Sequence, residues 1–304
     1  MLDSTRLQQF EQGLDPLNPT ASKIPCKILG YGEISCVLEI DNNHELAAKR
    51  MPLFTSRVEA TEYARNYTNY CERLREAGLH VPEDTTVIVK GHAGIFVLYI
   101  LQKQLPPPRF CHKLIHSEDT TFSSAMVERI VGEIEKVWTY NEQHDPELKL
   151  AIDGQLSNWV LLSSGEIAFI DTSTPLMHEQ GVEILDPELL IQSAPSFLRW
   201  LIRWQFLDDV MNRYYDRRLV YTDLIANLFK EQSPQLVEHW IAVINSICSD
   251  KKMEVLDRAQ IEAYYREDKM IWRLFLGLRR IDRFLKTKLM RHRYEFVLPG
   301  RIKR

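Results

Sequence analysis

Cysteine pairing is the first feature that this sequence lacks. Its 304 residues include five cysteines, an odd number, and no two of them form a Cys-x-x-Cys pair. A disulfide framework or a structural zinc site would need paired, closely spaced cysteines, so we expect neither, and we expect a reducing compartment. The five are Cys26, Cys36, Cys71, Cys111 and Cys248.

Long apolar runs and a strong net charge are also missing. No stretch approaches the ~18 uninterrupted apolar residues of a membrane span, and the polar N-terminal stretch lacks the apolar core of a signal peptide. We therefore expect a cytoplasmic protein. The formal net charge of -4 gives no general attraction for nucleic acid or anionic lipid, and no nucleic-acid partner is expected.

The residue pattern divides the chain into three parts. Residues 1–22 are expected to form a short amphipathic helix and a linker. Residues 23–104 contain three β runs, a helix over about 57–77 and a second hairpin. Consecutive prolines at 106–108 interrupt this pattern, and residues 105–304 are mainly helical, with two short β runs between the helices. The sequence therefore predicts an α+β fold of two lobes, a small antiparallel-sheet lobe followed by a larger helical lobe.

A glycine turn, Gly30-Tyr31-Gly32, joins the first two β runs. A dinucleotide-binding fingerprint would need a helix directly after the turn, and a Walker loop would need Gly-Lys-Ser/Thr, so the sequence excludes both. Glycines in a hairpin can instead let backbone N–H groups approach the phosphates of a nucleotide. An ordinary hairpin turn is the alternative interpretation.

Lys49 lies among apolar neighbours on the next β run. A cation in this place can reach the α and β phosphates of a nucleotide covered by the glycine turn, and a carboxylate must hold it. We expect Glu62 on the following helix to be that carboxylate, with Glu59 as the alternative. A solvated lysine on the strand surface is the simpler interpretation of Lys49 considered alone.

Three further polar residues form the most specific pattern. Asp153 and Asn158 lie five residues apart, and Asp171 ends the second of the two short β runs that follow. Metal-assisted phosphoryl transfer needs a carboxylate to orient the acceptor hydroxyl and oxygen ligands to hold Mg²⁺. Each residue alone would be typical of a turn or a cap, but their order and spacing together favour this chemistry.

These motifs resemble those of the protein-kinase-like superfamily, and the nearest branch is that of the aminoglycoside phosphotransferases and choline kinases. That family has a His-Gly-Asp-x-x-x-x-Asn segment, followed by a metal-binding Asp after a short apolar strand. Here the corresponding segment is 151–158, AIDGQLSN, and Asp171 follows the apolar pair Phe169-Ile170. The similarity covers residues 24–175 by motif and the rest only by helical character.

The resemblance implies the two-lobed fold of protein kinases and the binding of ATP and Mg²⁺. It implies that Asp153 is the catalytic base, that Asn158 and Asp171 bind Mg²⁺, and that Lys49 binds phosphate with Glu62 as its partner. The remaining nucleotide contacts that it implies lie in the phosphate loop and the hinge: Gly30, Tyr31, Gly32, Gln102, Lys103 and Gln104.

The chain departs from the family pattern in three ways. Ala151 replaces the family histidine, Ser35 replaces the third loop glycine, and Thr172-Ser173 follow Asp171 in place of Phe-Gly or of an aromatic residue and an acid. Because that histidine braces the catalytic loop, its loss is expected to affect the rate more than nucleotide binding.

Taken together, the motifs favour ATP- and Mg²⁺-dependent transfer of the γ-phosphoryl group to a hydroxyl. No Ala-Pro-Glu segment follows Asp171, which favours a small-molecule acceptor over a peptide. Two alternatives keep the nucleotide site: transfer of AMP to a protein, and nucleotide binding without transfer in a regulatory scaffold.

The C-terminal stretch 278–304 is strongly basic. Its cations alternate with apolar residues as in an amphipathic helix, which can bind an anionic membrane or a phosphate-bearing partner. The alternative is a terminal helix that packs on the domain and exposes a basic face.

Overall fold

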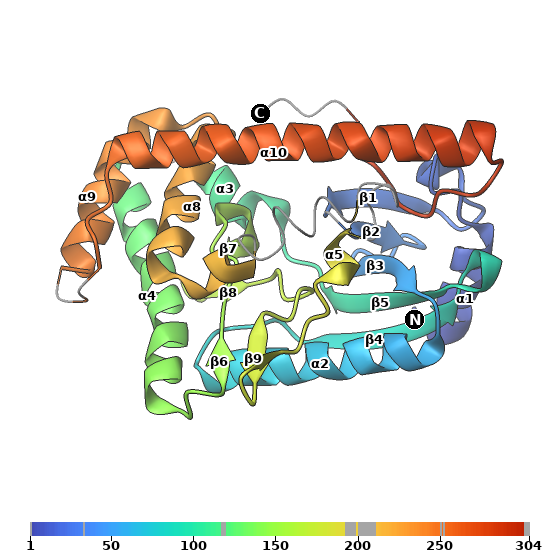
Figure 1. Ribbon diagram of the computed structural model, residues 1–304, viewed down its shortest axis with the longest axis horizontal. Coiled ribbons are helices and arrows are strands. Elements are labelled where there is room, and N and C mark those ends of the chain that lie inside the picture. The colour runs from blue at the N-terminus through green and yellow to red at the C-terminus, as the bar shows by residue number, and fades with distance from the viewer. Residues whose placement is uncertain are drawn as a thin grey trace.

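The computed structural model describes residues 2–32, 34–116, 120–191, 199, 211–249, 251 and 253–300. Within these residues the protein has an α+β fold, in which a sheet region adjoins a helical region (Figure 1). The predicted fold class is therefore confirmed at this level. Among the described residues, no helix combines the length and the apolar character that crossing a bilayer requires.

One five-stranded antiparallel sheet dominates the sheet region. The strands pair in the spatial order β1-β2-β3-β5-β4. They are β1 (Cys26–Tyr31), β2 (Cys36–Ile40), β3 (Leu46–Phe54), β4 (Asp84–Lys90) and β5 (Phe96–Lys103). This confirms the predicted succession of three strands, a helix and two strands.

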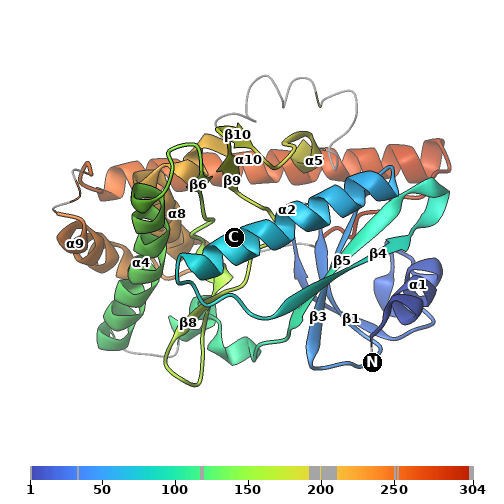
Figure 2. The ribbon, with the colours of Figure 1, turned by 90° about the horizontal axis from the view of Figure 1, so that it is seen from below.

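Two helices cover opposite faces of the sheet. α1 (Ser4–Gly13) packs against β4 and shares a core with side chains such as Leu38, whereas α2 (Arg57–Glu76) packs on the other face with Met51. α2 begins after Ser56, whose side chain accepts a hydrogen bond from the backbone N–H of Glu59, as expected for an N-cap. Figure 2 shows α2 extending from the sheet to the helical region.

The helical region contains the predicted helices and more short strands than expected. Its helices are α3 (Cys111–Leu114), α4 (Thr120–Gln143), α5 (Glu188–Ile191), α8 (Arg217–Lys230), α9 (Val237–Ile247) and α10 (Arg258–Phe284), which continues into a π-helical turn over Leu285–Leu289. Its strands are β6 (Lys149–Leu150), β7 (Trp159–Leu161), β8 (Ile167–Phe169), β9 (Met177–Glu179) and β10 (Val182–Glu183).

β7 and β8 form the predicted hairpin, whereas the small sheet β10-β9-β6 was not predicted. The prediction that residues 105–304 are mainly helical is confirmed for the segments that form α4, α8, α9 and α10. Residues 192–198 and 200–210 lie outside the described part.

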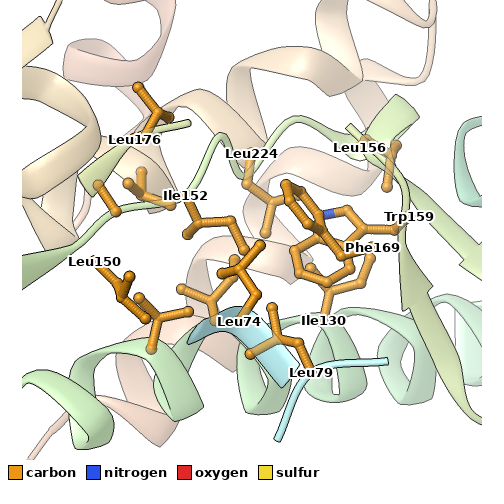
Figure 3. Close-up of a cluster of buried hydrophobic side chains, with 14 of the residues drawn as sticks. Leu74, Leu79, Ile130, Leu150, Ile152, Leu156, Trp159, Phe169, Leu176 and Leu224 are labelled. Atoms are coloured by element: carbon orange, nitrogen blue, oxygen red, sulfur yellow. The ribbon is translucent and has the colours of Figure 1, made fainter. Parts of the chain in front are cut away.

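A single apolar core joins the two regions. Leu74 and Leu79, at and after the end of α2, lie beside Ile130 of α4 and the pair Trp159 and Phe169 (Figure 3). The two aromatic rings are tilted, with their centroids 5.1 Å apart. Because α2 contributes side chains to both regions, the two cannot move apart without exposing this core to water.

Two segments near the ends of the chain, around Glu11 and Glu295, meet at the face of β3 that carries Arg50. α10 runs along one long edge of the molecule past both regions (Figure 1), and the chain then returns to the sheet. Arg50 of β3 is fully buried, and its guanidinium donates to both carboxylate oxygens of Glu11 at 2.7 and 2.6 Å and to the backbone oxygen of Glu295 at 2.7 Å. The Tyr99 hydroxyl also donates to Glu11, at 2.6 Å.

We expect Glu11→Gln to lower the free energy of unfolding by about 3–5 kcal/mol, because it removes the nearer carboxylate from the buried guanidinium of Arg50 and leaves only the Glu295 carboxylate, at 3.3 Å, as counter-charge. Burial alone would raise the pKa of Glu11, but the charge and hydrogen bonds of Arg50 outweigh it and lower that pKa. The stabilisation that the Glu11–Arg50 pair contributes is thus fully present above the pKa of Glu11 in the unfolded chain, and it is lost as the pH falls through the lower pKa of Glu11 in the folded protein. Urea unfolding at neutral and acidic pH measures both effects.

Two further variants control this experiment. Glu62→Gln changes an exposed carboxylate and should shift the unfolding free energy by less than ~0.5 kcal/mol. Replacing the pair together, as Glu11→Leu with Arg50→Met, should recover much of the loss, since no buried charge is left unpaired. A small decrease in the free energy of unfolding of Glu11→Gln would show that the ion pair is dispensable for stability.

Candidate functional site

A cavity of about 460 Å³ opens between the sheet region and the helical region. Its wall is formed by the β1–β2 hairpin, β3, the end of β5, α3 and the segments next to β7 and β8. Most of the predicted site residues line it: Gly30, Tyr31, Gly32, Lys49, Gln102, Lys103, Gln104, Asn158 and Asp171. Two predicted residues, Glu62 and Asp153, are not among its lining residues.

The glycine hairpin forms one edge of this cavity. β1 extends through the first glycine, so that Gly30 pairs with Val37 of β2. The backbone N–H of Gly32 donates to the Ser35 carbonyl at 3.0 Å and closes the turn. A Cβ atom at Gly32 would lie 2.5 Å from the Ser35 hydroxyl oxygen, so this position favours glycine. At its two glycines the turn therefore presents backbone rather than side chains to the cavity.

Lys49 reaches across the cavity to the helical region. Side chains alternate along β3, so Lys49 faces the cavity while Ala48 and Arg50 face the opposite core. The Lys49 ammonium lies 2.6 Å from Asp171 Oδ1 and also donates to the Ser173 hydroxyl. Burial would raise the pKa of Asp171, but the charge and hydrogen bond of Lys49 lower it overall, so the carboxylate stays ionised near neutral pH.

The predicted pairing of Lys49 with Glu62 is wrong in this structure. The Glu62 side chain is 62% exposed and lies 3.7 Å from Arg65. The alternative, Glu59, accepts hydrogen bonds from the backbone and side chain of Thr55. Both carboxylates point away because tyrosines occupy the face of α2 that lies against the helical region.

Three buried tyrosines of α2 hold the segments that carry the site. The Tyr63 hydroxyl donates to the backbone oxygen of Ser173 at 2.6 Å, and the Tyr70 hydroxyl donates to the backbone oxygen of Ala151 at 2.8 Å. Between them, the Tyr67 hydroxyl accepts from Thr172 Oγ1 at 3.3 Å. Sequence reasoning missed these residues, although their spacing of four and three positions is that of one helix face.

Asp153 lies beside a second, much smaller cavity, of about 10 Å³, which Arg213, Asp223 and Tyr264 also line. Its Oδ1 accepts the backbone N–H of Gln155 at 3.1 Å. Burial, then the negative charge of Asp223, then that of Asp171, raise the pKa of Asp153 to about 7. Near neutral pH Asp153 is therefore protonated to a substantial extent, whereas an ordinary aspartate is almost fully ionised.

Asp223 is the second carboxylate of this small cavity, and the sequence reasoning missed it. It lies on α8 among buried apolar residues, and it accepts a hydrogen bond from the Tyr264 hydroxyl at 3.1 Å. Burial raises its pKa as well. A carboxylate between the apolar runs 219–221 and 224–226 of α8 was the available signal.

Asn158 and Asp171 are the residues of the larger cavity that suit a magnesium ion. The Asn158 amide nitrogen donates to the backbone oxygen of Asp153 at 3.1 Å, which fixes the orientation of the side chain. The described residues contain no cluster of three His, Cys, Asp or Glu side chains that could hold a metal ion by themselves. Mg²⁺ usually takes one or two carboxylates and completes its shell with phosphates and water, so this pair fits such an ion.

Polar atoms without partners lie at the end of the cavity formed by β5 and α3. Gln102 Nε2, Gln104 Oε1 and His112 Nδ1 are buried and have no hydrogen-bond partner within the described part of the chain. Burial and the neighbouring cations, Lys113 first, lower the pKa of His112 to about 4, so the imidazole is neutral. Buried polar atoms are normally paired, so these atoms are available to hydrogen-bond a polar ligand.

We expect Tyr70→Phe to lower the free energy of unfolding by about 1–3 kcal/mol, because the buried Ala151 carbonyl loses its donor while the ring still fills its place. Chemical denaturation measures the loss. Tyr31→Phe, on a side chain that is 45% exposed, is the matched control and should cost less than ~0.5 kcal/mol. Equal effects in the two variants would contradict a role for Tyr70 in anchoring the Asp153 segment.

We expect the carboxyl carbon of Asp153 to titrate near pH 7 in ¹³C NMR, and Asp223→Asn to lower that pKa. Removing a negative neighbour stabilises the ionised form of Asp153, so the carboxyl group loses its proton at lower pH. Asp153→Asn assigns the resonance, and Glu62→Gln should leave it unchanged. A pKa that stays constant or rises in Asp223→Asn would refute the electrostatic coupling.

No curated protein matches the chain. A protein family does match over residues 18–283, from before β1 almost to the end of α10. The match covers most of the chain and includes every residue of the two cavities described above. The protein therefore belongs to this family, which is described as a family of unknown function (DUF6206).

Proposed function

We propose that this protein is a two-lobed, kinase-like phosphotransferase, which binds ATP with Mg²⁺ in the larger cavity and transfers the γ-phosphoryl group to a hydroxyl of a small molecule. The observation that carries this proposal is the contact between Lys49 and Asp171, residues 122 positions apart that meet at the cavity wall. A cation and a carboxylate next to a glycine hairpin match what nucleotide phosphates and their metal ion require.

The order of elements supports the kinase-like part of the proposal. The glycine hairpin β1–β2 comes first, then the lysine strand β3, the helix α2 and the hinge strand β5. This is the succession that the motif resemblance implies. The strand order β1-β2-β3-β5-β4 aligns Val37, Lys49 and Ile100 on adjacent strands, and all three line the cavity.

The cavity suits the base and the sugar of a nucleotide. Its volume lies within the usual range for small-molecule sites, and apolar side chains such as Val37, Ala47 and Ile170 line it. These can pack on the faces of a purine ring. The unpaired atoms of Gln102, Gln104 and His112 supply donors and acceptors for polar edges.

The opposite end of the cavity suits phosphates. Lys49 would bind the α and β phosphates, the Gly32 turn would approach them with its backbone, and Asn158 and Asp171 would hold Mg²⁺. The bound ion would neutralise charge on the phosphate oxygens. Within this arrangement Lys49 keeps Asp171 ionised, which is the form that binds a cation.

Asp153 would accept the proton of the acceptor hydroxyl. Its pKa of about 7 is suited to a general base that works near neutral pH. Ala151 stands where the family has a bracing histidine. The hydrogen bond from Tyr70 to the Ala151 carbonyl braces the same segment by another route, and it supports an active enzyme over a binding module.

We expect ATP to raise the melting temperature of the protein only when Mg²⁺ is present. A ligand at ~100 times its Kd stabilises the folded state by about 2.7 kcal/mol, which a thermal-shift assay detects readily. Asp171→Ala should lose the magnesium-dependent part of the shift. Asp153→Asn is the matched variant: it should keep the shift, because Asp153 is not among the residues that line the larger cavity, and lose phosphoryl transfer.

The reaction products distinguish phosphoryl transfer from AMP transfer and from nucleotide binding without transfer. Release of ADP with a phosphorylated acceptor supports the proposal, whereas pyrophosphate release would identify AMP transfer. A full Mg²⁺-dependent shift with no turnover on any hydroxyl compound would identify a nucleotide-binding module. No shift with any nucleotide in the wild-type protein would overturn the proposal.

A further inference from the structure

The long helix α10 has two apolar faces, and only one of them is covered. The inner face buries residues such as Ile261, Leu276 and Arg279 against the rest of the protein. The outer face also carries large apolar side chains, and these are exposed. Met270, Leu274, Ile281 and Phe284 have exposed fractions of 64, 57, 51 and 58%.

These exposed residues form one continuous stripe. They are spaced by four, seven and three positions, so at about 100° per residue they fall within roughly 80° of the helix circumference. The stripe lies opposite Ile261 and Arg279 and extends about 21 Å from Met270 to Phe284. Leu289 and Met290, 68 and 55% exposed, continue the apolar surface beyond the helix.

A row of arginines borders the stripe on one side. Arg266, Arg273 and Arg280 are exposed and lie seven residues apart, which places them along one line of the helix. None of the three forms an ion pair with any other described residue. Arg280 donates to the backbone oxygen of Gly300 at 3.0 Å, a contact that leaves its charge uncompensated.

The positive charge is concentrated in this part of the protein. Residues 266–293 contain ten Lys or Arg against three Asp or Glu, whereas the whole chain has a formal net charge of -4. Overall composition therefore does not account for the cations beside the stripe. Their position next to exposed apolar side chains is the arrangement of a helix that lies at a membrane–water interface.

We propose that the outer face of α10, formed by the apolar stripe and the arginine row, binds the surface of an anionic membrane. The apolar side chains enter the boundary between headgroups and acyl chains, and the arginines bind lipid phosphates. Because α10 runs along one long edge of the molecule (Figure 1), the protein lies with that edge on the membrane.

Charge and shape favour a membrane over other occupants. In an antiparallel dimer formed through this face, the arginine rows of the two copies would lie on the same side and close together, and like charges at an interface are unfavourable. A protein partner would need a groove that fits a straight helix ridge, whereas a fluid lipid surface adapts to it. This inference does not depend on the proposed enzymatic activity.

Vesicle flotation tests the proposal with the full-length protein. We expect binding to vesicles of phosphatidylcholine mixed with phosphatidylglycerol, weaker binding at high salt, and little binding to phosphatidylcholine alone. Arg273→Gln with Arg280→Gln should reduce the partition coefficient about thirtyfold, since each cation near an anionic surface contributes about fivefold. Leu274→Ser with Phe284→Ser should also abolish most of the binding.

Matched variants on other surfaces control for general effects of polarity and charge. Val58→Ser with Val255→Ser changes side chains that are 75 and 67% exposed, and Lys90→Gln removes an exposed cation from the sheet region. These should bind vesicles as the wild type does. Circular dichroism and the melting temperature verify that each variant is folded.

Three results would overturn the proposal. The first is equal binding to neutral and anionic vesicles, and the second is an equal loss of binding in the control variants. The third is self-association in analytical ultracentrifugation that Leu274→Ser with Phe284→Ser removes while no vesicle binding is seen. That last result would assign the face to a second copy of the chain.

Discussion

The tyrosine face of α2 is the constraint on which the geometry of the site depends. Lys49 and Asp171 come from different regions, and their side chains are 18 and 37% exposed, so their ion pair contributes no more than about 1 kcal/mol. Tyr63, Tyr67 and Tyr70 are buried, and each bonds to a segment that carries a site residue. The ion pair is therefore a consequence of the way the two regions are joined, not its cause.

Two adjacent residues of β3 point to opposite faces of the sheet, one to the cavity and one to the buried ion pair. Lys49 faces the cavity, while Arg50 faces the opposite side and binds Glu11 and Glu295, near the two ends of the chain. The alternation of a strand makes this division possible. Because Arg50 is wholly buried, loss of its contacts with Glu11 and Glu295 leaves a poorly compensated charge directly beside Lys49. The ends of the chain thus help to fix the position of Lys49.

The sequence carried most of the information about the fold and about the residues at the cavity. The order of strands and helix in the first hundred residues followed from local patterns, and the glycine turn, Lys49, Asn158 and Asp171 were found by motif. Glu62 was chosen wrongly as the partner of Lys49, because the number of residues between a cation and a carboxylate does not say which face of a helix the carboxylate occupies. Packing decides that, and the tyrosines fit the interface better than a charged group.

Other features could not be predicted because they arise only when distant segments meet. The sequence does not single out His112, since an isolated histidine has no partner visible in sequence, yet it lies at the cavity with an unpaired nitrogen. Asp223 matters because its charge raises the pKa of Asp153, which lies 70 positions earlier in the chain. For α10, the sequence indicated an amphipathic helix but could not say which apolar residues would be covered. Ile281 and Phe284, which would normally be assigned to the core, are exposed.

The two carboxylates Asp153 and Asp171 show how their surroundings can give identical side chains different chemistry. Both are partly shielded from water, which by itself raises the pKa of each. Asp171 faces the ammonium of Lys49, and its pKa falls below the ordinary value. Asp153 faces a second negative charge, that of Asp223, and its pKa rises to about 7. A permanently ionised carboxylate suits cation binding, and one that gains and loses a proton near neutral pH suits proton transfer. This division of roles follows from the three-dimensional neighbours of each residue, and it is the electrostatic arrangement that a metal-assisted transfer to a hydroxyl needs.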